Sequence, residues 1–588
     1  MDGFFIERKT MSKFYITTPI YYPSAKLHIG HAYCTTMADT IARYHRMKGD
    51  DTYFLTGTDE HGEKIQKNAE LANKTPQEFV DNIVKDIKKL WSTLQISNDD
   101  YIRTTELRHE KVVKEVFSKM LENGDIYLGK YEGWYCTPCE SFWTNTQVQG
   151  DDHLCPDCGR PCHKSSEEAY FFKMSKYSSK LMDFYNIHPD FITPESRKNE
   201  MINNFIKPGL EDLCVSRTSF TWGIQVDENP KHVVYVWLDA LFNYLSALGY
   251  LSDDDSLFKK FWADDSYIVH LVGNDITRFH VIYWPIFLMS LGLRLPDKVF
   301  VHGLLMMKDG KMSKSKGNVV DPYPLIERYG LDAVRYYLVR ETIFGQDGTF
   351  TPEQFVERIN IDLANDFGNL LNRTIGMMNK YFGGVIPAYN GVVTPLDAEL
   401  EATGKQAIKS YQNNFETLHV TEAIMNVFEY ISKANKYIED TKPWALAKDE
   451  TKVEELKSCM NHLANVLRQT AILLKPVLME APSKLFEQLN IEEKYQEFAT
   501  VSSFDLLGGE KVGSEKKRIR KGINILITTP GRIIYHVKNS QNLQFPNLKF
   551  LVLDEADRLL DMGFLKPITE LIHTLPERQT ILLSATLP

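Results

Sequence analysis

The sequence predicts an α/β protein with a doubly wound parallel sheet, an inserted cysteine-rich module and an all-helical C-terminal half. Three observations lead to this fold class. Strand and helix periodicities alternate near the N-terminus, five of the eight cysteines lie between Cys136 and Cys162, and strands give way to long amphipathic patterns after about residue 355. At about 100–200 residues per domain, 588 residues suggest several domains.

The first elements establish the sheet. Residues 14–18 alternate like a strand, a loop rich in proline and tyrosine follows, residues 30–47 have helical periodicity, and residues 52–56 read as the next strand. This β–α–β order implies a Rossmann-like parallel sheet. Its ligands are expected where loops leave the carboxyl ends of the strands.

The loop after the first strand contains His28-Ile29-Gly30-His31. Two imidazoles three residues apart lie at a helix start, where the helix dipole adds partial positive charge and Gly30 allows a close backbone approach. This arrangement suits a polyphosphate and the charge that develops on an α-phosphate under attack. A structural histidine pair or part of a metal site are the alternatives.

A second signature, Lys311-Met312-Ser313-Lys314-Ser315, follows a strand-like segment at 299–305. Long basic side chains beside a glycine can bind phosphates from the ground state to the transition state. A solvated basic loop is the alternative for such a lysine run taken alone.

The cysteine cluster has the spacing of a zinc knuckle. Cys136 and Cys139 form one Cys-x-x-Cys pair, Cys155 and Cys158 form another, and fifteen residues separate the pairs. Four thiolates predict a structural Zn²⁺ site, because catalytic zinc keeps one position open. Cys162 lies nearby and is not counted as a ligand.

Together the two signatures resemble those of class I aminoacyl-tRNA synthetases. The segments Thr-Thr-Pro-Ile-Tyr-Tyr-Pro at 17–23 and Thr-Gly-Thr-Asp-Glu-His-Gly at 56–62 are similar to the methionyl-tRNA synthetase family, and the resemblance extends from about residue 13 to 509. It implies that methionine attacks ATP to give methionyl-adenylate and pyrophosphate, that Mg²⁺ accompanies ATP, and that methionine then passes to tRNA(Met).

The resemblance also implies the site residues. The catalytic residues would be His28, His31 and Lys314. ATP would contact Gly30, Gly273, Asp275, Lys311, Ser313 and Ser315. The methionine pocket would comprise Ile20, Tyr22, Asp59, Trp237, Ala240, Leu241, Tyr244 and His302, although Leu241 replaces a proline found in some relatives. Without the family, Trp237 and Tyr244 would read as ordinary helix core.

The helical half resembles the family's anticodon-binding domain. There Asn369, Arg373, Pro443 and Trp444 match the residues that hold anticodon bases. The predicted units are an N-terminal extension (1–12), two catalytic halves (13–118 and 231–305), an acceptor-end insertion with the knuckle (119–230), the region of the basic signature (306–354), the helical bundle (355–505) and a C-terminal fragment (506–588).

The C-terminal fragment differs in charge and in motif content. Residues 511–588 carry twelve Lys/Arg and seven Asp/Glu, against 56 and 71 in the rest. Thr529-Pro530-Gly531-Arg532, Asp554-Glu555-Ala556-Asp557 and Ser584-Ala585-Thr586 resemble motifs of DEAD-box RNA helicases. This partial RecA-like unit has no preceding phosphate-binding loop, so we expect no ATP hydrolysis. We interpret the join near Gly508-Gly509 as a gene-model fusion, with a genuine chimera as the alternative.

The remaining expectations concern partners and location. Methionine, ATP and tRNA(Met) are the expected partners, no apolar run is long enough for a membrane span, and a cytoplasmic monomer is expected. Either Met1 or Met11 could be the start. The alternatives are another class I synthetase, a bifunctional RNA-remodelling ATPase, and a non-catalytic tRNA-binding protein.

Overall fold

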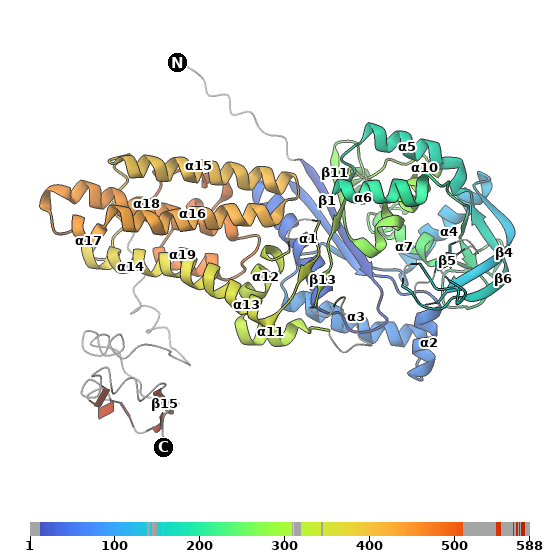
Figure 1. Ribbon diagram of the computed structural model, residues 1–588, viewed down its shortest axis with the longest axis horizontal. Coiled ribbons are helices and arrows are strands. Elements are labelled where there is room, and N and C mark those ends of the chain that lie inside the picture. Colours follow the sequence, from blue (N-terminus) through green and yellow to red (C-terminus); the bar gives the residue numbers. More distant parts are fainter. Residues whose placement is uncertain are drawn as a thin grey trace, which may run out of the picture.

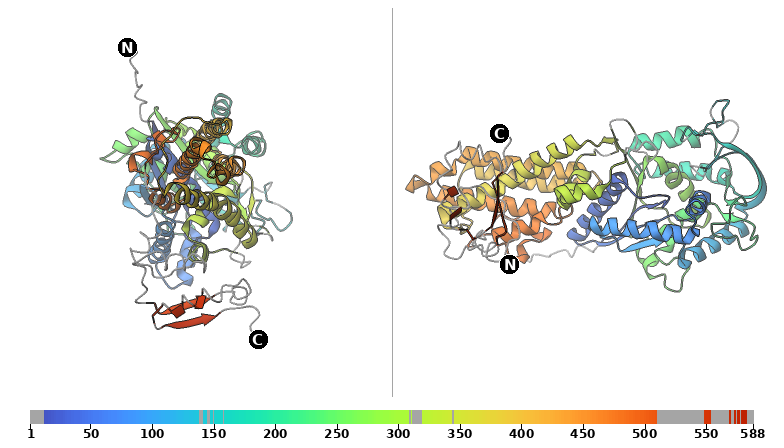
Figure 2. Two further views of the ribbon diagram at one scale, coloured as in Figure 1. Left: turned by 90° about the vertical axis from the view of Figure 1, so that its left-hand side faces the viewer. Right: turned by 90° about the horizontal axis from the view of Figure 1, so that it is seen from below.

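The computed structural model describes residues 12–137, 141–143, 147–148, 150–156, 158–307, 310, 319–342, 345–509, 548–553 and a few short pieces between 568 and 582. Figure 1 shows an elongated molecule, with a central sheet, a helical bundle at one end and a smaller, strand-rich module at the other. Figure 2 shows the same division from below.

A six-stranded, all-parallel sheet organises the catalytic half. Its order is β3-β2-β1-β11-β12-β7. The strands are β1 (Lys13–Tyr21), β2 (Asp51–Thr58), β3 (Asp100–Arg103), β7 (Ile192–Thr193), β11 (Ser266–Gly273) and β12 (Lys298–His302). The predicted doubly wound parallel sheet is confirmed.

Helices cover both faces of this sheet, so the strands bury side chains on either side. Phe14 and Ile16 of β1 join the core on one face, whereas Tyr15 joins the core on the other. The helices before the second half of the sheet are α1 (Ile29–Lys48), α2 (Glu63–Leu71), α3 (Pro76–Thr93), α4 (Leu107–Glu122), α5 (Ser178–Ile187) and α6 (Glu195–Met201). Those that follow are α7 (Val236–Leu241), α8 (Asn243–Ser246), α9 (Ser256–Phe261) and α10 (Trp284–Ser290).

The inserted module is built on an antiparallel sheet of order β5-β4-β6-β8. Its strands are β4 (Ile126–Cys136), β5 (Ser141–Trp143), β6 (His163–Phe172) and β8 (Leu213–Cys214). The chain does not stay in the module throughout the predicted span 119–230. Within that span β7 pairs with β12 and forms an edge of the main sheet.

The C-terminal half is a helical bundle that shares one core with the catalytic half. Buried residues of α1 and of α12 belong to the same cluster as those of the bundle, so no solvent layer separates the two. The helices are α11 (Pro322–Tyr329), α12 (Leu331–Arg340), α13 (Pro352–Arg358), α14 (Asn369–Phe382), α15 (Pro395–Glu416), α16 (Val420–Thr441), α17 (Pro443–Leu446), α18 (Val453–Leu474) and α19 (Ala481–Leu489). No helix among the described residues is long and apolar enough to cross a membrane.

The bundle's fold extends to Gly509. The Leu507 side chain is buried, the Asn461 amide donates to the Leu507 carbonyl, and the Gly509 backbone N–H donates to the carbonyl of Ile386 over 2.8 Å. Beyond this point the described residues include a parallel pair, β15 (Phe550–Leu553) and β16 (Gln579–Leu582). Figure 1 shows β15 apart from the bundle.

Candidate active site

A cleft of about 500 Å³ opens at the carboxyl edge of the main sheet. It lies where β1 ends at Tyr21, β11 ends at Gly273 and β12 ends at His302. This is the position expected for a ligand site in a doubly wound sheet. Its lining includes thirteen of the residues predicted for catalysis, ATP binding or methionine binding: Ile20, Tyr22, His28, Gly30, His31, Asp59, Trp237, Ala240, Leu241, Tyr244, Gly273, Asp275 and His302.

The two signature histidines form a reciprocal cap at the start of α1. The Gly30 backbone N–H donates to His28 Nδ1, and the His28 backbone N–H donates to His31 Nδ1, each over 3.1 Å. Because Nδ1 accepts in both rings, each neutral imidazole carries its proton on Nε2. The ring centroids are 4.1 Å apart. The cap therefore holds two N–H donors at a helix N-terminus in the cleft.

Gly30 leaves room for the His28 ring. A Cβ at this position would lie 3.0 Å from His28 Cε1 and 3.1 Å from His28 Nδ1. A larger residue would require the imidazole to shift slightly. The close backbone approach of a phosphate at Gly30 stays a prediction.

Aromatic rings form one part of the cleft lining, called the aromatic wall below. Trp237 stacks on Phe279 with centroids 3.5 Å apart and an interplanar angle of 9°. The Tyr244 hydroxyl lies 2.7 Å from His280 Nε2, and burial lowers the pKa of His280 to about 4. A neutral imidazole and a phenol therefore add polar groups to the apolar rings of this wall.

A buried carboxylate ties the Asp59 loop to this wall. Asp239 lies on α7 beside Trp237 and Ala240, and accepts from His61 Nδ1 at 2.7 Å and His109 Nε2 at 2.8 Å. Burial alone would raise the pKa of Asp239, but the two histidines more than offset this and hold it below its usual value. The network joins the segments that carry His61, His109 and Asp239.

Several lining residues were not predicted as ligand contacts. Cys34 follows the histidine signature on α1, and Asn243 and His280 come from the second half of the sheet. The Asn243 Oδ1 atom is buried and has no hydrogen-bond partner among the described residues. The α1 periodicity marks Cys34 only as buried, and nothing in the sequence shows that Asn243 faces the cleft.

The five residues of the basic signature lie outside the described residues, but the turn before them is described. Among them are Lys311, Ser313, Lys314 and Ser315. The turn before them is closed by two backbone hydrogen bonds of 2.9 Å between Met307 and Gly310, where Gly310 has φ +108°. The signature therefore starts just after β13 (Leu305–Met306), and Leu305 itself lines the cleft.

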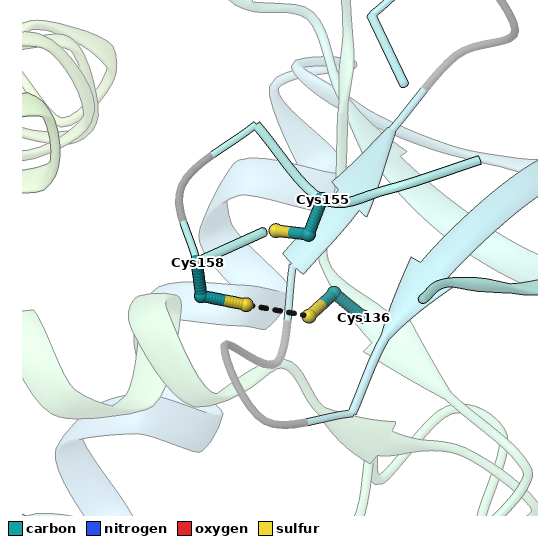
Figure 3. Close-up of side chains that lie close together, drawn as sticks. All are labelled: Cys136, Cys155 and Cys158. Carbon is teal, nitrogen blue, oxygen red and sulfur yellow. Dashed lines mark hydrogen bonds between the residues drawn. The ribbon is translucent and has the colours of Figure 1, made fainter. Parts of the chain in front are cut away.

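Three of the predicted zinc ligands converge in the inserted module (Figure 3). The sulfur atoms of Cys136, Cys155 and Cys158 lie within 4.8 Å of one another, and those of Cys136 and Cys158 are 3.6 Å apart. Tetrahedral zinc with bonds of about 2.3 Å to sulfur places two thiolates about 3.8 Å apart. The cluster therefore fits a metal of this kind. Cys139 lies outside the described residues.

The predicted anticodon residues lie on two helices of the bundle, α14 and α17. Arg373 on α14 donates to Glu439 Oε1 near the end of α16 at 2.5 Å, and α17 with Trp444 follows directly. Asn369 is exposed and the Trp444 side chain is 40% exposed, while Pro443 is buried. An exposed indole is suited to stacking on an unpaired base.

The helicase-like motifs lie outside the described residues. Their residues are Thr529–Arg532, Asp554, Glu555, Ala556, Asp557, Ser584, Ala585 and Thr586. The predicted apolar strand before Asp554 is β15.

Comparisons with known proteins assign the two parts of the chain. The family described as tRNA synthetases class I (M) matches residues 14–167 and 160–375, and the anticodon binding domain of methionyl tRNA ligase matches residues 386–512. The DEAD/DEAH box helicase family matches residues 461–588. The first part of that last match, 461–509, overlaps α18 and α19 of the bundle.

Curated relatives are similar over most of the chain. Methionine–tRNA ligase of Bacillus subtilis is 58% identical over 509 residues, which cover 85% of this chain and 76% of that protein. The corresponding enzyme of Halalkalibacterium halodurans is 56% identical over 510 residues, covering 85% and 77%.

Solved structures agree with this similarity. Mycobacterium tuberculosis methionyl-tRNA synthetase in complex with methionyl-adenylate superimposes with a TM-score of 0.81 at 40% identity, covering 86% of this chain and 99% of that one. The free-state structure of that enzyme gives 0.76 at 38% identity, covering 86% and 97%.

Proposed function

The chain belongs to the class I methionyl-tRNA synthetases, and from this premise we propose how its cleft carries out the reaction. As a methionine–tRNA ligase, the protein joins methionine to ATP, giving methionyl-adenylate and pyrophosphate, and transfers methionine to the 3′-terminal adenosine of tRNA. The residue assignments depend on one observation. The histidine signature and all residues of the expected methionine pocket line the same cleft.

His28 and His31 bind the phosphates in this proposal. Their capping bonds fix the tautomer, so both Nε2–H groups can donate to phosphate oxygens as charge develops at the α-phosphorus. Lys314 and its neighbours in the basic signature act from the other side of ATP, and Gly273 and Asp275 contact the adenosine. A Mg²⁺ ion bound with ATP supplies further charge neutralisation.

Methionine lies between the carboxylate of Asp59 and the aromatic wall. Asp59 receives the substrate ammonium, with Asn243 Oδ1 as a further acceptor. Ile20, Trp237, Ala240, Leu241 and Tyr244 surround the thioether, which favours contact with aromatic rings. His280 and His302 are the polar neighbours of the thioether sulfur. Burial holds the pKa of both histidines below the usual value.

The cysteine cluster holds one structural zinc ion, with Cys139 as the fourth ligand. The metal would fix the fold of the inserted module and take no part in the chemistry. At the other end of the molecule, Asn369, Arg373 and Trp444 read the anticodon of tRNA(Met). We also propose that the enzyme is cytoplasmic and acts as a monomer. Sedimentation at several protein concentrations tests the monomeric state.

The assignment of His28 is tested by His28→Asn. Asparagine still caps the helix but cannot place an N–H where Nε2 lies, so α1 should remain intact. We expect methionine-dependent ATP–pyrophosphate exchange to fall by roughly 10²–10³ in kcat/KM, the usual effect of losing one such donor. His188→Asn, at an exposed position outside the cleft, is the matched control and should be neutral.

Two outcomes would contradict the proposal. Exchange activity within a few-fold of the parent in His28→Asn would remove His28 from the phosphate site. Absence of any methionine-dependent exchange in the folded parent chain would contradict the enzymatic function as a whole.

A further inference from the structure

One arginine lies between the cysteine knuckle and the methionine pocket. Arg278 Cζ is 5.0 Å from the ring centroid of Trp143, 5.1 Å from Phe205, 5.0 Å from Phe279 and 5.8 Å from Tyr283. All four distances are within the range of a cation–π contact. The rings come from β5 of the knuckle and from two π-helical segments, Ile202–Ile206 and Phe279–Tyr283, the second of which borders the cleft.

On the pocket side, the guanidinium contacts a ring that forms the cleft wall. Phe279 stacks on Trp237, and both line the cleft. The Trp237 indole nitrogen is buried and has no hydrogen-bond partner among the described residues. No described hydrogen bond therefore fixes the indole, which is held by packing against the core and by the stack with Phe279.

On the other side, the guanidinium contacts the core of the knuckle. Trp143 is 4% exposed and packs in one small cluster with Cys136, Cys155 and Cys162. Cys158 itself lines the cleft. The cysteines and the methionine pocket are therefore joined through Trp143, Arg278, Phe279 and Trp237.

We infer that Arg278 is a positioning residue that makes the shape of the methionine pocket depend on the folded knuckle. The inference rests on the proposed methionine pocket. When the knuckle is intact, Trp143 holds the guanidinium, which in turn holds Phe279 against Trp237. When the knuckle loses its shape, this support is lost and the pocket binds methionine less well.

The planar guanidinium is needed for this role. Arginine stacks on aromatic faces, whereas the lysine ammonium is a compact, strongly hydrated charge. Arg278→Lys therefore keeps the charge and removes the stacking surface, and Arg278→Met keeps an apolar stem without charge. Arg328, whose Cζ lies 5.2 Å from the Tyr329 ring on α11, offers a matched control in Arg328→Lys.

The test is a cycle of methionine affinities on the full chain. Calorimetric Kd values for methionine are measured for the parent, Arg278→Lys, Arg278→Met and Arg328→Lys, each zinc-loaded and again after removal of metal by a chelator. We expect metal removal to weaken binding about tenfold in the parent and in Arg328→Lys. In both Arg278 variants the zinc-loaded form should already bind about tenfold more weakly, and metal removal should change Kd by less than about twofold.

The kinetic pattern should separate positioning from general destabilisation. In pyrophosphate exchange, the KM for methionine should rise in the Arg278 variants while kcat and the KM for ATP stay near the parent values. The inference is overturned if the variants bind methionine as the parent does, or if metal removal weakens every protein equally. If the zinc-loaded parent fails to bind methionine, the proposed function fails first, which is a different result.

Discussion

His280 is the residue in the cleft whose protonation state follows most directly from its contacts. Its Nδ1 lies 3.0 Å from the Ile276 carbonyl, which can only accept, so Nδ1 carries the proton. Its Nε2 then accepts from the Tyr244 hydroxyl at 2.7 Å. Both ring nitrogens are used in the neutral form, and burial lowers the pKa to about 4.

We predict that His280 stays neutral across the pH range in which the enzyme works. The unfolded residue binds a proton below about pH 6.5, whereas the folded one does so only near pH 4. Its contribution to stability is therefore complete above about pH 6.5 and declines as the pH falls towards 4. In ¹⁵N-histidine NMR spectra, assigned with His280→Gln, its ring signals should not shift between pH 5 and 8. A titration midpoint above pH 6 would contradict the prediction.

Among individual residues, the sequence predicts the site best where a motif contains the reactive or binding side chains. The residues named from the histidine signature and from the Trp237 segment do line one cleft. Cys34 and Asn243 were missed because facing the cleft depends on how segments far apart in sequence pack together. The pairing of Tyr244 with His280 is of the same kind, since 36 residues separate the two.

At the scale of elements, one buried arginine joins the signature helix to the bundle. Arg335 on α12 donates to Asp39 Oδ2 on α1 at 2.6 Å, and to the carbonyls of Leu94, Pro476 and Val477 at 3.0–3.1 Å. The Arg335 and Asp39 side chains are both fully buried. α1, the end of α3, α12 and the turn after α18 therefore meet at one guanidinium.

Replacing Arg335 should lower the free energy of unfolding. Arg335→Met removes the guanidinium donor from three buried carbonyls and from Asp39, which keeps its hydrogen bonds from Arg43 and Ser97. Each buried polar group left without a partner costs about 1–3 kcal/mol. We expect a large fall in the urea midpoint measured by circular dichroism. Lys484→Met removes the exposed Lys484–Glu480 pair and should change stability by less than about 1 kcal/mol. Equal midpoints for the two variants would exclude a structural role for Arg335.

Local periodicity explains which elements were predictable. The strands at 14–18 and 52–56 and the helix at 30–47 correspond to β1, β2 and α1 with slightly wider bounds. β7 was not predicted, because two residues carry no periodicity and their place is decided by pairing with β12. The π-helical stretch Ile359–Gly368, which joins α13 to α14, likewise has no distinct pattern in the sequence.

At the scale of the whole molecule, the catalytic half and the bundle behave as one packed body. A single core extends from β1 through α1 and α12 into α15, α16 and α18. The segment after α19 closes this core. The Arg468 side chain on α18 donates to the carbonyls of Tyr495 and Thr500 at 3.1 Å and also to Ser503, and the buried Phe498, Val501, Phe504 and Leu507 complete the packing.

This packing predicts where the chain can be shortened. A chain ending at Gly509 keeps every contact of the bundle described above, so we expect an unchanged unfolding midpoint and methionine-dependent exchange within about twofold of the full chain. A chain ending at Lys494 loses the carbonyls that satisfy Arg468 and four buried apolar side chains, each contributing about 1.5–3 kcal/mol. It should unfold at much lower urea concentration.

The pair of truncations separates two views of the C-terminal segment. The helicase family matches from residue 461, yet residues 461–509 pack as part of the synthetase bundle. If the helicase-like segment supports the synthetase, removing residues 510–588 should lower stability or activity. If only the bundle matters, the Gly509 chain should match the full protein while the Lys494 chain fails, and we expect this second result.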